Sequence, residues 1–352
     1  MSTLADIGEL QLLEKVLLPC VTSLADGLGD DCARIEQTKR RLLWSIDPCP
    51  TPVAQWLGVC TPRVLGWYTA LINLSDIAAC GGRPIGMLVS LEMPDDTPVS
   101  FVESFYEGLL AALEAHQSLL LGGNVKSAAR FSATGTIVGE EGAHAVGRIT
   151  GSEDCFAYLV GDCGSFWASV LGHQRGWGAA SKIEADRLRD ALLFPRPQVA
   201  AGSILAELPF QIACMDCSDG PANALFQLAR SNNLELVVPD RPDWAIPTEA
   251  CNLLGLHQIP LENACYHFGD WQLACLVPID QRKSFEERMR GIPLTWMGRA
   301  RKGFGGVVTE GGRQLLPESL NQNFRSGYNS MKSADGLIER FMNQPVFSKA
   351  PK

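Results

Sequence analysis

The sequence lacks the features of a nucleic-acid-binding, secreted or membrane protein. Positive charge is in deficit, because 30 Lys and Arg residues stand against 39 Asp and Glu, a net charge of −9. A protein that neutralises nucleic-acid phosphates needs the opposite balance, so we expect no nucleic-acid partner. The N-terminus carries Asp6, Glu9 and Glu14 among its leucines, unlike a signal peptide, and uncharged apolar stretches such as 64–75 are shorter than the roughly 18 residues of a membrane span. We therefore expect a cytoplasmic protein with no membrane partner.

Metal-binding and disulfide patterns are also scarce. The 5 histidines are scattered, and there is one C-x-x-C sequence, Cys214 to Cys217. A zinc site usually needs a second such pair or a pair of histidines, and the acidic residue between these two thiols disfavours a redox pair. The 12 cysteines show no repeated spacing, and 352 residues bury a large core without disulfides. We expect reduced, packed thiols.

Two common catalytic motifs are missing as well. No segment fits G-x-x-x-x-G-K-[ST], which excludes a P-loop, and none fits G-x-S-x-G, the nucleophile motif of α/β hydrolases. The chemistry of the chain therefore has to be sought in its other polar residues.

Length and hydrophobic periodicity predict two domains of the α/β or α+β class. At about 150 residues per domain, 352 residues correspond to two. The pattern restarts after Gly147 and Arg148, so we expect domains at 1–148 and 149–352 and, in the polar C-terminal residues, a loosely ordered tail. The expected strands are 42–46, 86–93, 119–121, 131–138, 155–160, 211–215, 234–238, 272–277 and 294–297, and the expected helices are 64–80, 98–116, 199–208 and 221–230.

The distinctive feature of the sequence is the position of its aspartates. Five of them follow a predicted strand or a glycine turn at Gly29; these are Asp30, Asp31, Asp47, Asp216 and Asp219. Asp76 lies on the predicted helix 64–80, three residues after Asn73, so both side chains project from one face. Gly122, Gly123 and Asn124 follow another strand. One such aspartate is usually a turn former or helix cap, but several at strand ends indicate a shared crevice.

Clustered carboxylates favour a cation among them. They raise one another's pKa values unless positive charge lies nearby, and Mg²⁺ binds in proteins through one or two carboxylates together with substrate phosphates. The glycines let backbone N–H groups approach phosphate, and the helix after Gly220 offers its N-terminus to an anion. These residues alone predict a Mg²⁺–nucleotide site.

The same segments resemble a known family. Gly29-Asp30-Asp31-Cys32-Ala33, Ser45-Ile46-Asp47, N-L-S-D-I-A-A from Asn73 with Gly82-Arg83-Pro84, and Asp216-Cys217-Ser218-Asp219-Gly220 occur in this order. They are similar to the motifs of the thiamine-monophosphate kinase family, within the aminoimidazole-ribonucleotide-synthetase-like superfamily. The resemblance covers roughly residues 25–300, and Phe268-Gly269-Asp270-Trp271-Gln272-Leu273 and Met297-Gly298-Arg299 are weaker echoes of later motifs.

The resemblance implies a homodimer whose N-terminal ATP- and Mg²⁺-binding domain contributes to a barrel across the interface, with a C-terminal α/β domain packed behind. It also implies transfer of the γ-phosphoryl group of ATP to a small phosphorylated substrate, thiamine monophosphate, giving thiamine diphosphate and ADP. Carried over by position, the implied metal ligands are Asp30, Asp47, Asp76, Asp216 and Asp219, with Asp76 and Asp219 as the catalytic pair. The implied nucleotide contacts are Gly29, Asp30, Asp31, Gly122, Gly123, Asn124 and Ser218, and the implied substrate contacts are Trp56, Asp270 and Trp271.

The chain departs from the family pattern on the substrate side, and this leaves two alternatives. Asn124 stands where the family has an aspartate, and Gly269 and Gln272 replace two glutamates. The same ATP site could serve a ligase, cyclase or dehydratase of the superfamily. The chain could also be a non-catalytic nucleotide-binding homologue. ADP formation with and without thiamine monophosphate separates these readings.

Overall fold

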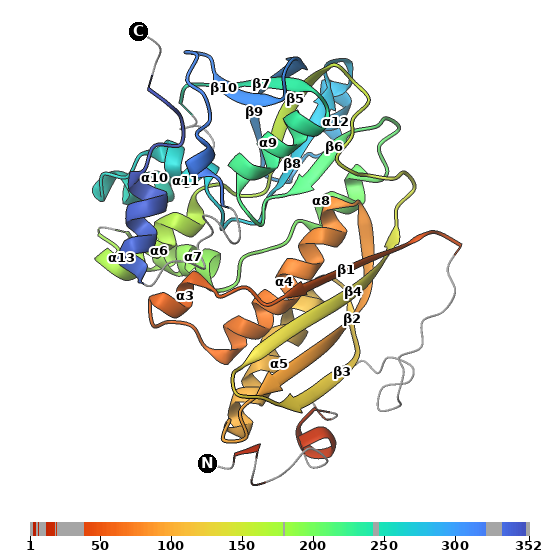
Figure 1. The fold of residues 1–352 in the computed structure, drawn as a ribbon, viewed down its shortest axis with the longest axis vertical. Helices are drawn as coiled ribbons and strands as arrows, with labels where there is room; N and C mark the ends of the chain where they lie inside the picture. The colour runs from red at the N-terminus through yellow and green to blue at the C-terminus, as the bar shows by residue number, and fades with distance from the viewer. Residues whose placement is uncertain are drawn as a thin grey trace.

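The structure is a computed structural model that describes residues 39–178, 180–241, 246–321 and 333–349, with residues 3, 4, 6, 12–17 and 19 near the N-terminus. Two β-sheets, each with helices packed on it, lie in the two halves of the molecule (Figure 1). The predicted mixed α/β class is confirmed. Among the helices of the described residues, none is long and apolar enough to cross a bilayer.

The first sheet has four strands in the order β1-β4-β2-β3. The strands are β1 (Leu42–Pro48), β2 (Gly82–Met93), β3 (Leu119–Ser127) and β4 (Ser132–Glu141). Strand β4 is antiparallel to both β1 and β2, whereas β2 and β3 are parallel and joined through helix α5 (Val99–Ala115). The sheet is open at β1 and β3, so the described chain by itself forms no closed barrel.

Helix α4 (Pro62–Ala79) is the central element of the molecule. Thr61 caps its N-terminus by accepting a hydrogen bond from the Val64 backbone at 3.4 Å, and Pro62 occupies the first turn, where its missing N–H costs nothing. Its apolar residues face two ways: Leu74 packs in the core with the first sheet, and Leu71 packs in the core of the second half. The helix is therefore buried on both sides (Figure 1).

The second sheet has six strands in the order β10-β7-β9-β5-β8-β6. The strands are β5 (Asp154–Val160), β6 (Ala213–Asp216), β7 (Leu234–Val238), β8 (Leu273–Pro278), β9 (Leu294–Lys302) and β10 (Gly306–Thr309). Its helices are α6 (Ser165–Arg175), α7 (Lys182–Leu193), α8 (Val199–Leu205), α9 (Pro221–Ser231), α10 (Thr248–Leu256), α11 (Leu261–Tyr266) and α12 (Arg282–Arg288). Successive residues of β5 and β8 enter two different cores, so this sheet is buried on both faces.

Both cores draw residues from the two halves of the chain. One core joins Tyr68 and Leu71 of α4 to Trp167 of α6, and the other joins Leu74 of α4 to Leu205 of α8. The two sheets therefore pack as one body around α4. The ten described cysteines are free thiols, and two pairs touch inside the second half: Cys163 with Cys265 at 3.4 Å and Cys214 with Cys275 at 3.8 Å between sulfurs.

Three expectations about the fold are corrected. The C-terminal tail is not loosely ordered over residues 333–349, because it forms helix α13 (Ala334–Ile338) and buries Phe341 beside Phe268 at 5.2 Å between ring centroids. Its apolar residues are too irregularly spaced to show a period, yet they fill the core. Strand β3 continues through residues 122–124 instead of ending there. The apolar run at 42–46 predicts a buried strand, but β1 is an edge strand whose outer face is exposed.

Two glycines set the close approach of α4 and α5. A Cβ atom on Gly66 would lie 1.9 Å from the Phe105 carbonyl oxygen, and one on Gly108 would lie 1.8 Å from the Arg63 carbonyl oxygen. We expect Gly108→Ala to lower the free energy of unfolding by about 2 kcal/mol, because the backbones must separate. Gly255→Ala is the matched control, since α10 leaves open space there, and it should be neutral or stabilising by up to about 1 kcal/mol. Urea unfolding of both variants checks this, and equal effects would contradict it.

Candidate active site

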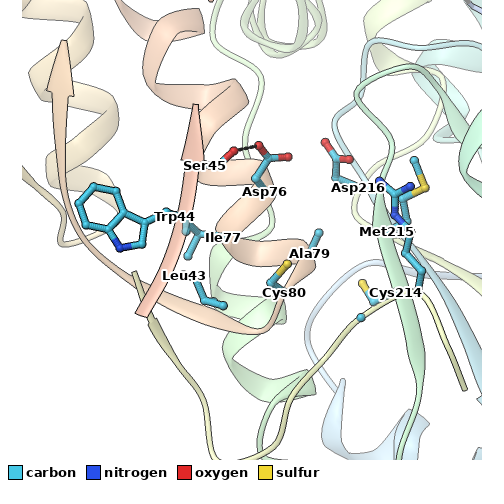
Figure 2. A pocket seen from close by; sticks show the side chains of 12 residues that line it. Leu43, Trp44, Ser45, Asp76, Ile77, Ala79, Cys80, Cys214, Met215 and Asp216 are labelled. Atoms are coloured by element: carbon cyan, nitrogen blue, oxygen red, sulfur yellow. Dashed lines mark hydrogen bonds between the residues drawn. The ribbon is translucent and has the colours of Figure 1, made fainter. Parts of the chain in front are cut away.

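Four aspartates from three parts of the chain converge between the two sheets. Asp47 lies on β1, Asp76 on the last turns of α4, Asp216 at the end of β6, and Asp219 in the turn before α9. Asp47 and Asp76 are within side-chain hydrogen-bond contact, and Asp216 acts electrostatically on Asp47 and on Asp219. Figure 2 shows Asp76 and Asp216 facing one another from α4 and β6. We call these four residues the aspartate cluster.

The alternation of β1 explains how Asp47 reaches the cluster. Ser45 and Asp47 lie on the inner, half-buried face of this strand, while Trp44 and Ile46 are on the exposed face. Figure 2 shows Ser45 and Trp44 on opposite sides of the ribbon. Asn73 adds a constraint from α4, because its side-chain amide donates to the Asp47 carbonyl at 3.4 Å.

Neutral groups hold the side chains of the cluster. The Ser45 hydroxyl donates to Asp76, and the Ser75 hydroxyl donates to Asp216 at 3.2 Å. Ser218 also hydrogen-bonds Asp216, and Asn321 donates to Asp219 at 2.9 Å. Within the described residues, none of the ion pairs involves the aspartate cluster. The carboxylates are therefore oriented without being neutralised.

Burial and mutual repulsion raise the pKa values of all four carboxyl groups. Burial raises the pKa of Asp76 to about 7, and nearby Asp47 adds to the rise. Burial, followed by the charge of Asp76, raises the pKa of Asp216 to about 6. The pKa values of Asp47 and Asp219 are also raised, first by burial and then by the neighbouring aspartates. A group of carboxylates in this state lacks positive charge, and a bound cation would supply it.

A cavity of about 250 Å³ opens beside the cluster at the junction of the two halves. Its lining residues are Leu43, Trp44, Ser45, Asp76, Ile77, Ala79, Cys80, Gly147, Arg148, Cys214, Met215 and Asp216 (Figure 2). Arg148 is the one cationic side chain of this lining, and its charge opposes the rise in the pKa of Asp76. Its guanidinium also donates to Gln227 of α9 at 3.0 Å, so it connects the cavity to the second half.

The cluster fits Mg²⁺ better than a metal held by protein ligands alone. In the described part of the chain, no three His, Cys, Asp or Glu side chains stand together in a way that could hold a metal ion. Mg²⁺ does not require this, because it typically keeps its waters and binds through one or two carboxylates and substrate phosphates. The contact between Asp47 and Asp76 supplies two such carboxylates.

The predicted glycine and asparagine contacts lie apart from the cluster. Asp47 is level with Gly135 on β4, Val89 on β2 and Gly123 on β3. Three strand spacings separate Asp47 from Gly123, about 14 Å, which is too far for one cation to contact both. Gly122 and Asn124 share this edge strand. The other predicted nucleotide contacts near the N-terminus, Gly29, Asp30 and Asp31, lie outside the described residues.

The predicted substrate-side residues lie in or against the core of the second half. Trp56 ends helix α3 (Val53–Trp56) and is half-buried against that core, and Trp271 is buried edge-on to Tyr68 of α4 at 6.2 Å between ring centroids. Asp270 accepts hydrogen bonds from the backbone of Gly164 at 2.6 Å and of Phe166 at 2.8 Å. These bonds give Asp270 a structural role at the start of α6, and its contact with a substrate stays a prediction.

Sequence reasoning did not assign a role to Ser45, Ser75, Arg148 or Asn321. The two serines carry a signal in hindsight, because each lies next to or near an aspartate within a motif. Arg148 marks the predicted domain boundary, but nothing in the sequence points it at Asp76. Asn321 is 102 residues from Asp219, so no local pattern connects them.

Known proteins resemble the chain over most of its length. Residues 29–140 match the family described as AIR synthase related protein, N-terminal domain. The thiamine-monophosphate kinase of Aquifex aeolicus (strain VF5) is 27% identical over 322 residues, which cover 90% of this chain and 97% of that protein. A crystal structure of thiamine-monophosphate kinase from Stenotrophomonas maltophilia K279a has a TM-score of 0.70 at 26% identity and covers 86% of this chain and 94% of its own. The chain is therefore similar to thiamine-monophosphate kinases over most of its length.

Two further structures bear on the ligands of such proteins. The thiamine-monophosphate kinase-like fold recurs in AaThiL complexed with AMPPCP and TMP, with a TM-score of 0.67 at 25% identity over 90% of this chain and 97% of that one. The hydrogenase maturation protein HypE in complex with ATP has a TM-score of 0.68 at 17% identity over 88% of this chain and 94% of that one. At that identity HypE shares the fold alone.

The raised pKa values predict an unusual pH dependence for the metal-free protein. The folded-state pKa values of about 7 for Asp76 and about 6 for Asp216 exceed the ordinary value of 3.8. Between pH 3.8 and these raised values, the folded state therefore holds more protons than the unfolded state. The stability they contribute is present below pH 3.8 and is lost as the pH rises through 6 to 7. Asp76→Asn should therefore raise the metal-free melting temperature at pH 8 and change it little at pH 5.

Mg²⁺ should oppose that loss. We expect the ion to raise the melting temperature of the native protein by a few degrees at pH 8, and by less at pH 5, where protons compete for the carboxylates. Thermal unfolding with and without Mg²⁺ at both pH values measures this. Equal stabilisation of the native protein and Asp76→Asn would contradict the assignment of the ion to the cluster.

Proposed function

We propose that the chain transfers the γ-phosphoryl group of ATP to the phosphate of thiamine monophosphate, giving thiamine diphosphate and ADP. The observation that carries the proposal is the aspartate cluster, which lies where the two halves meet and has no ion-pair partner within the described residues. Relatives that align over 90% of this chain are thiamine-monophosphate kinases, and one solved relative is complexed with AMPPCP and TMP. A dehydratase- or ligase-type reaction has only the shared fold of HypE in its favour.

The reaction requires positioning and charge neutralisation more than a base. An oxygen of the acceptor phosphate attacks the γ-phosphorus, a new P–O bond forms, and the bond from the γ-phosphorus to the bridging oxygen breaks to release ADP. That attacking oxygen is already ionised, so no side chain has to remove a proton. Bound Mg²⁺ would neutralise the charge of the phosphates. Asp47, Asp76, Asp216 and Asp219, with Asp30 from the N-terminal motif, are the residues that would hold the ion or ions.

The hydroxyl donors fix the orientation of two carboxylates of the aspartate cluster. Ser45 orients Asp76 within the first half, and Ser75 reaches from α4 to Asp216 of the second half. Each donor contacts a carboxylate without cancelling its charge, so the negative charge stays in place for a cation. Arg148 lines the adjoining cavity and its charge acts on Asp76, which suits an anionic phosphate there.

We propose contacts for the nucleotide and for the acceptor from the positions of the described residues. Helix α9 begins after Gly220, and its free N–H groups next to Ser218 suit a phosphate. Gly29 and Asp31 remain proposed nucleotide contacts. Trp56 and Trp271 remain proposed substrate contacts on the side of α4 that faces the second half, and the half-buried ring of Trp56 suits the aromatic rings of thiamine better than the buried ring of Trp271. The proposed division is an N-terminal ATP- and Mg²⁺-binding domain, 1–148, and a C-terminal domain, 149–352.

The exposed face of the first sheet suits a second copy of the chain. Trp44 and Ile46 of β1 are 62% and 65% exposed, and Leu42 beside them and Leu88 of β2 are also exposed. A contiguous apolar sheet face of this kind usually marks a protein interface. We propose a homodimer in which two open sheets pack together as a barrel, so that Gly122, Gly123 and Asn124 of one copy approach the site region of the other.

The kinase assignment predicts a specific loss. Asp76→Asn should lower kcat by about a thousandfold or more, because one carboxylate of the cation site is removed while the shape of the side chain is kept. ADP release is followed with and without thiamine monophosphate. Asp190→Asn, an exposed change on α7, is the matched control and should retain activity. Normal turnover by Asp76→Asn, or ADP release independent of any acceptor, would overturn the assignment.

The dimer is tested separately. Trp44→Glu should shift the chain from dimer to monomer in sedimentation velocity, because a charge on the apolar face has to be desolvated on association. Ile183→Glu is the control, since Ile183 is 75% exposed on α7 and away from this sheet. Monomeric native protein, or an unchanged dimer in Trp44→Glu, would contradict the proposed interface.

A further inference from the structure

We propose that Asn321 is a positioning residue for the cation site, delivered to Asp219 from the C-terminal part of the chain. The inference rests on the proposed function, because it assigns Asp219 to the site that holds Mg²⁺ and nucleotide phosphates. Asn321 and Asp219 are separated by 102 residues in sequence, yet their side chains meet.

The backbone of residue 321 is fixed by a reciprocal clamp. The Asn223 side-chain amide donates to the Asn321 carbonyl at 2.8 Å, and the Asn321 backbone N–H donates back to the Asn223 carbonyl oxygen of the side chain at 2.9 Å. Asn223 lies in the first turn of α9, four residues after Asp219. The two asparagines are only 6% and 4% exposed, so these bonds are made away from water.

The clamp uses only the backbone of Asn321, and the side chain of this residue meets one carboxylate. Its amide nitrogen donates to Oδ1 of Asp219 at 2.9 Å. Helix α9, the turn before it and the C-terminal segment are thereby tied together at one point. Asp219 has no other side-chain donor among its described hydrogen bonds, so this amide decides which way the carboxylate faces.

An amide is the chemically suitable donor at this position. An Arg or Lys would orient Asp219 equally well but would cancel the charge that a cation requires. Asn321 holds one oxygen and leaves the negative charge in place. Residues that orient metal ligands in this way usually change metal affinity by 10- to 100-fold when they are removed.

The C-terminal segment offers a matched control at a different anchor. Asn263 of α11 donates to the carbonyl oxygens of Phe341 at 3.2 Å and Gln344 at 2.5 Å. It is 2% exposed, so its bonds resemble those of Asn223 in kind and burial. Asn263→Ala therefore loosens the C-terminal residues 333–349 without touching Asp219.

The test compares Asn321→Leu, which keeps volume and backbone clamp but loses the donor, with Asn263→Ala. Binding of the ATP analogue AMPPCP is measured by calorimetry at a series of Mg²⁺ concentrations, together with melting temperature and steady-state kinetics. We expect Asn321→Leu to raise the Mg²⁺ concentration for half-maximal AMPPCP binding about tenfold and to lower kcat, with the KM for thiamine monophosphate nearly unchanged. Asn263→Ala should lower the melting temperature and leave the Mg²⁺ dependence as in the native protein.

The outcomes separate this inference from the proposed function. An unchanged Mg²⁺ dependence in Asn321→Leu, or an equal shift in Asn263→Ala, overturns the role of Asn321. If the native protein binds AMPPCP with Mg²⁺ but transfers no phosphoryl group, the proposed function fails while the binding series still decides on Asn321. Native protein that binds no AMPPCP with Mg²⁺ overturns both.

Discussion

Helix α4 packs with one side on the first sheet and with the other on the core of the second half, and the site depends on this double burial. The helix carries Asp76 and Ser75 on neighbouring positions near its C-terminal end. Because both sides of α4 are fixed, Asp76 meets Asp47 of the first sheet while Ser75 meets Asp216 of the second. The close glycine contacts with α5 and the N-terminal cap also fix the position of α4. They determine where along the sheets Asp76 and Ser75 lie.

The aspartate cluster lowers the stability of the protein when no ligand is bound. Four buried or half-buried carboxyl groups with raised pKa values oppose folding when ionised, and their hydroxyl and amide donors reduce this cost only in part. Proteins tolerate such an arrangement where a ligand supplies the missing charge. The free energy that the ionised carboxyl groups cost the folded protein would then be regained when a cation and nucleotide phosphates bind.

Much of the fold and part of the site could be predicted from the sequence. Helices α4 and α5 show clear periods, strand β1 begins in a short apolar run, and Asp47, Asp76, Asp216 and Asp219 stand in recognisable motifs. What could not be predicted depends on distant parts of the chain. Asn321 meets Asp219 across 102 residues of sequence, and Phe341 lies in the core without periodic neighbours. The exposed face of β1 could not be predicted either, because a run of apolar residues does not reveal whether a strand lies at the edge of a sheet.

The hydrogen bond from Ser75 to Asp216 crosses from one half of the molecule to the other. Any rotation between the two sheets would change the separation of Asp76 from Asp216, and with it the repulsion between them. The electrostatic energy of the cluster therefore depends on the relative orientation of the two sheets. A cation that binds between these carboxylates would hold the two halves together as well as contact phosphate, so that cation binding would also strengthen the packing of the halves.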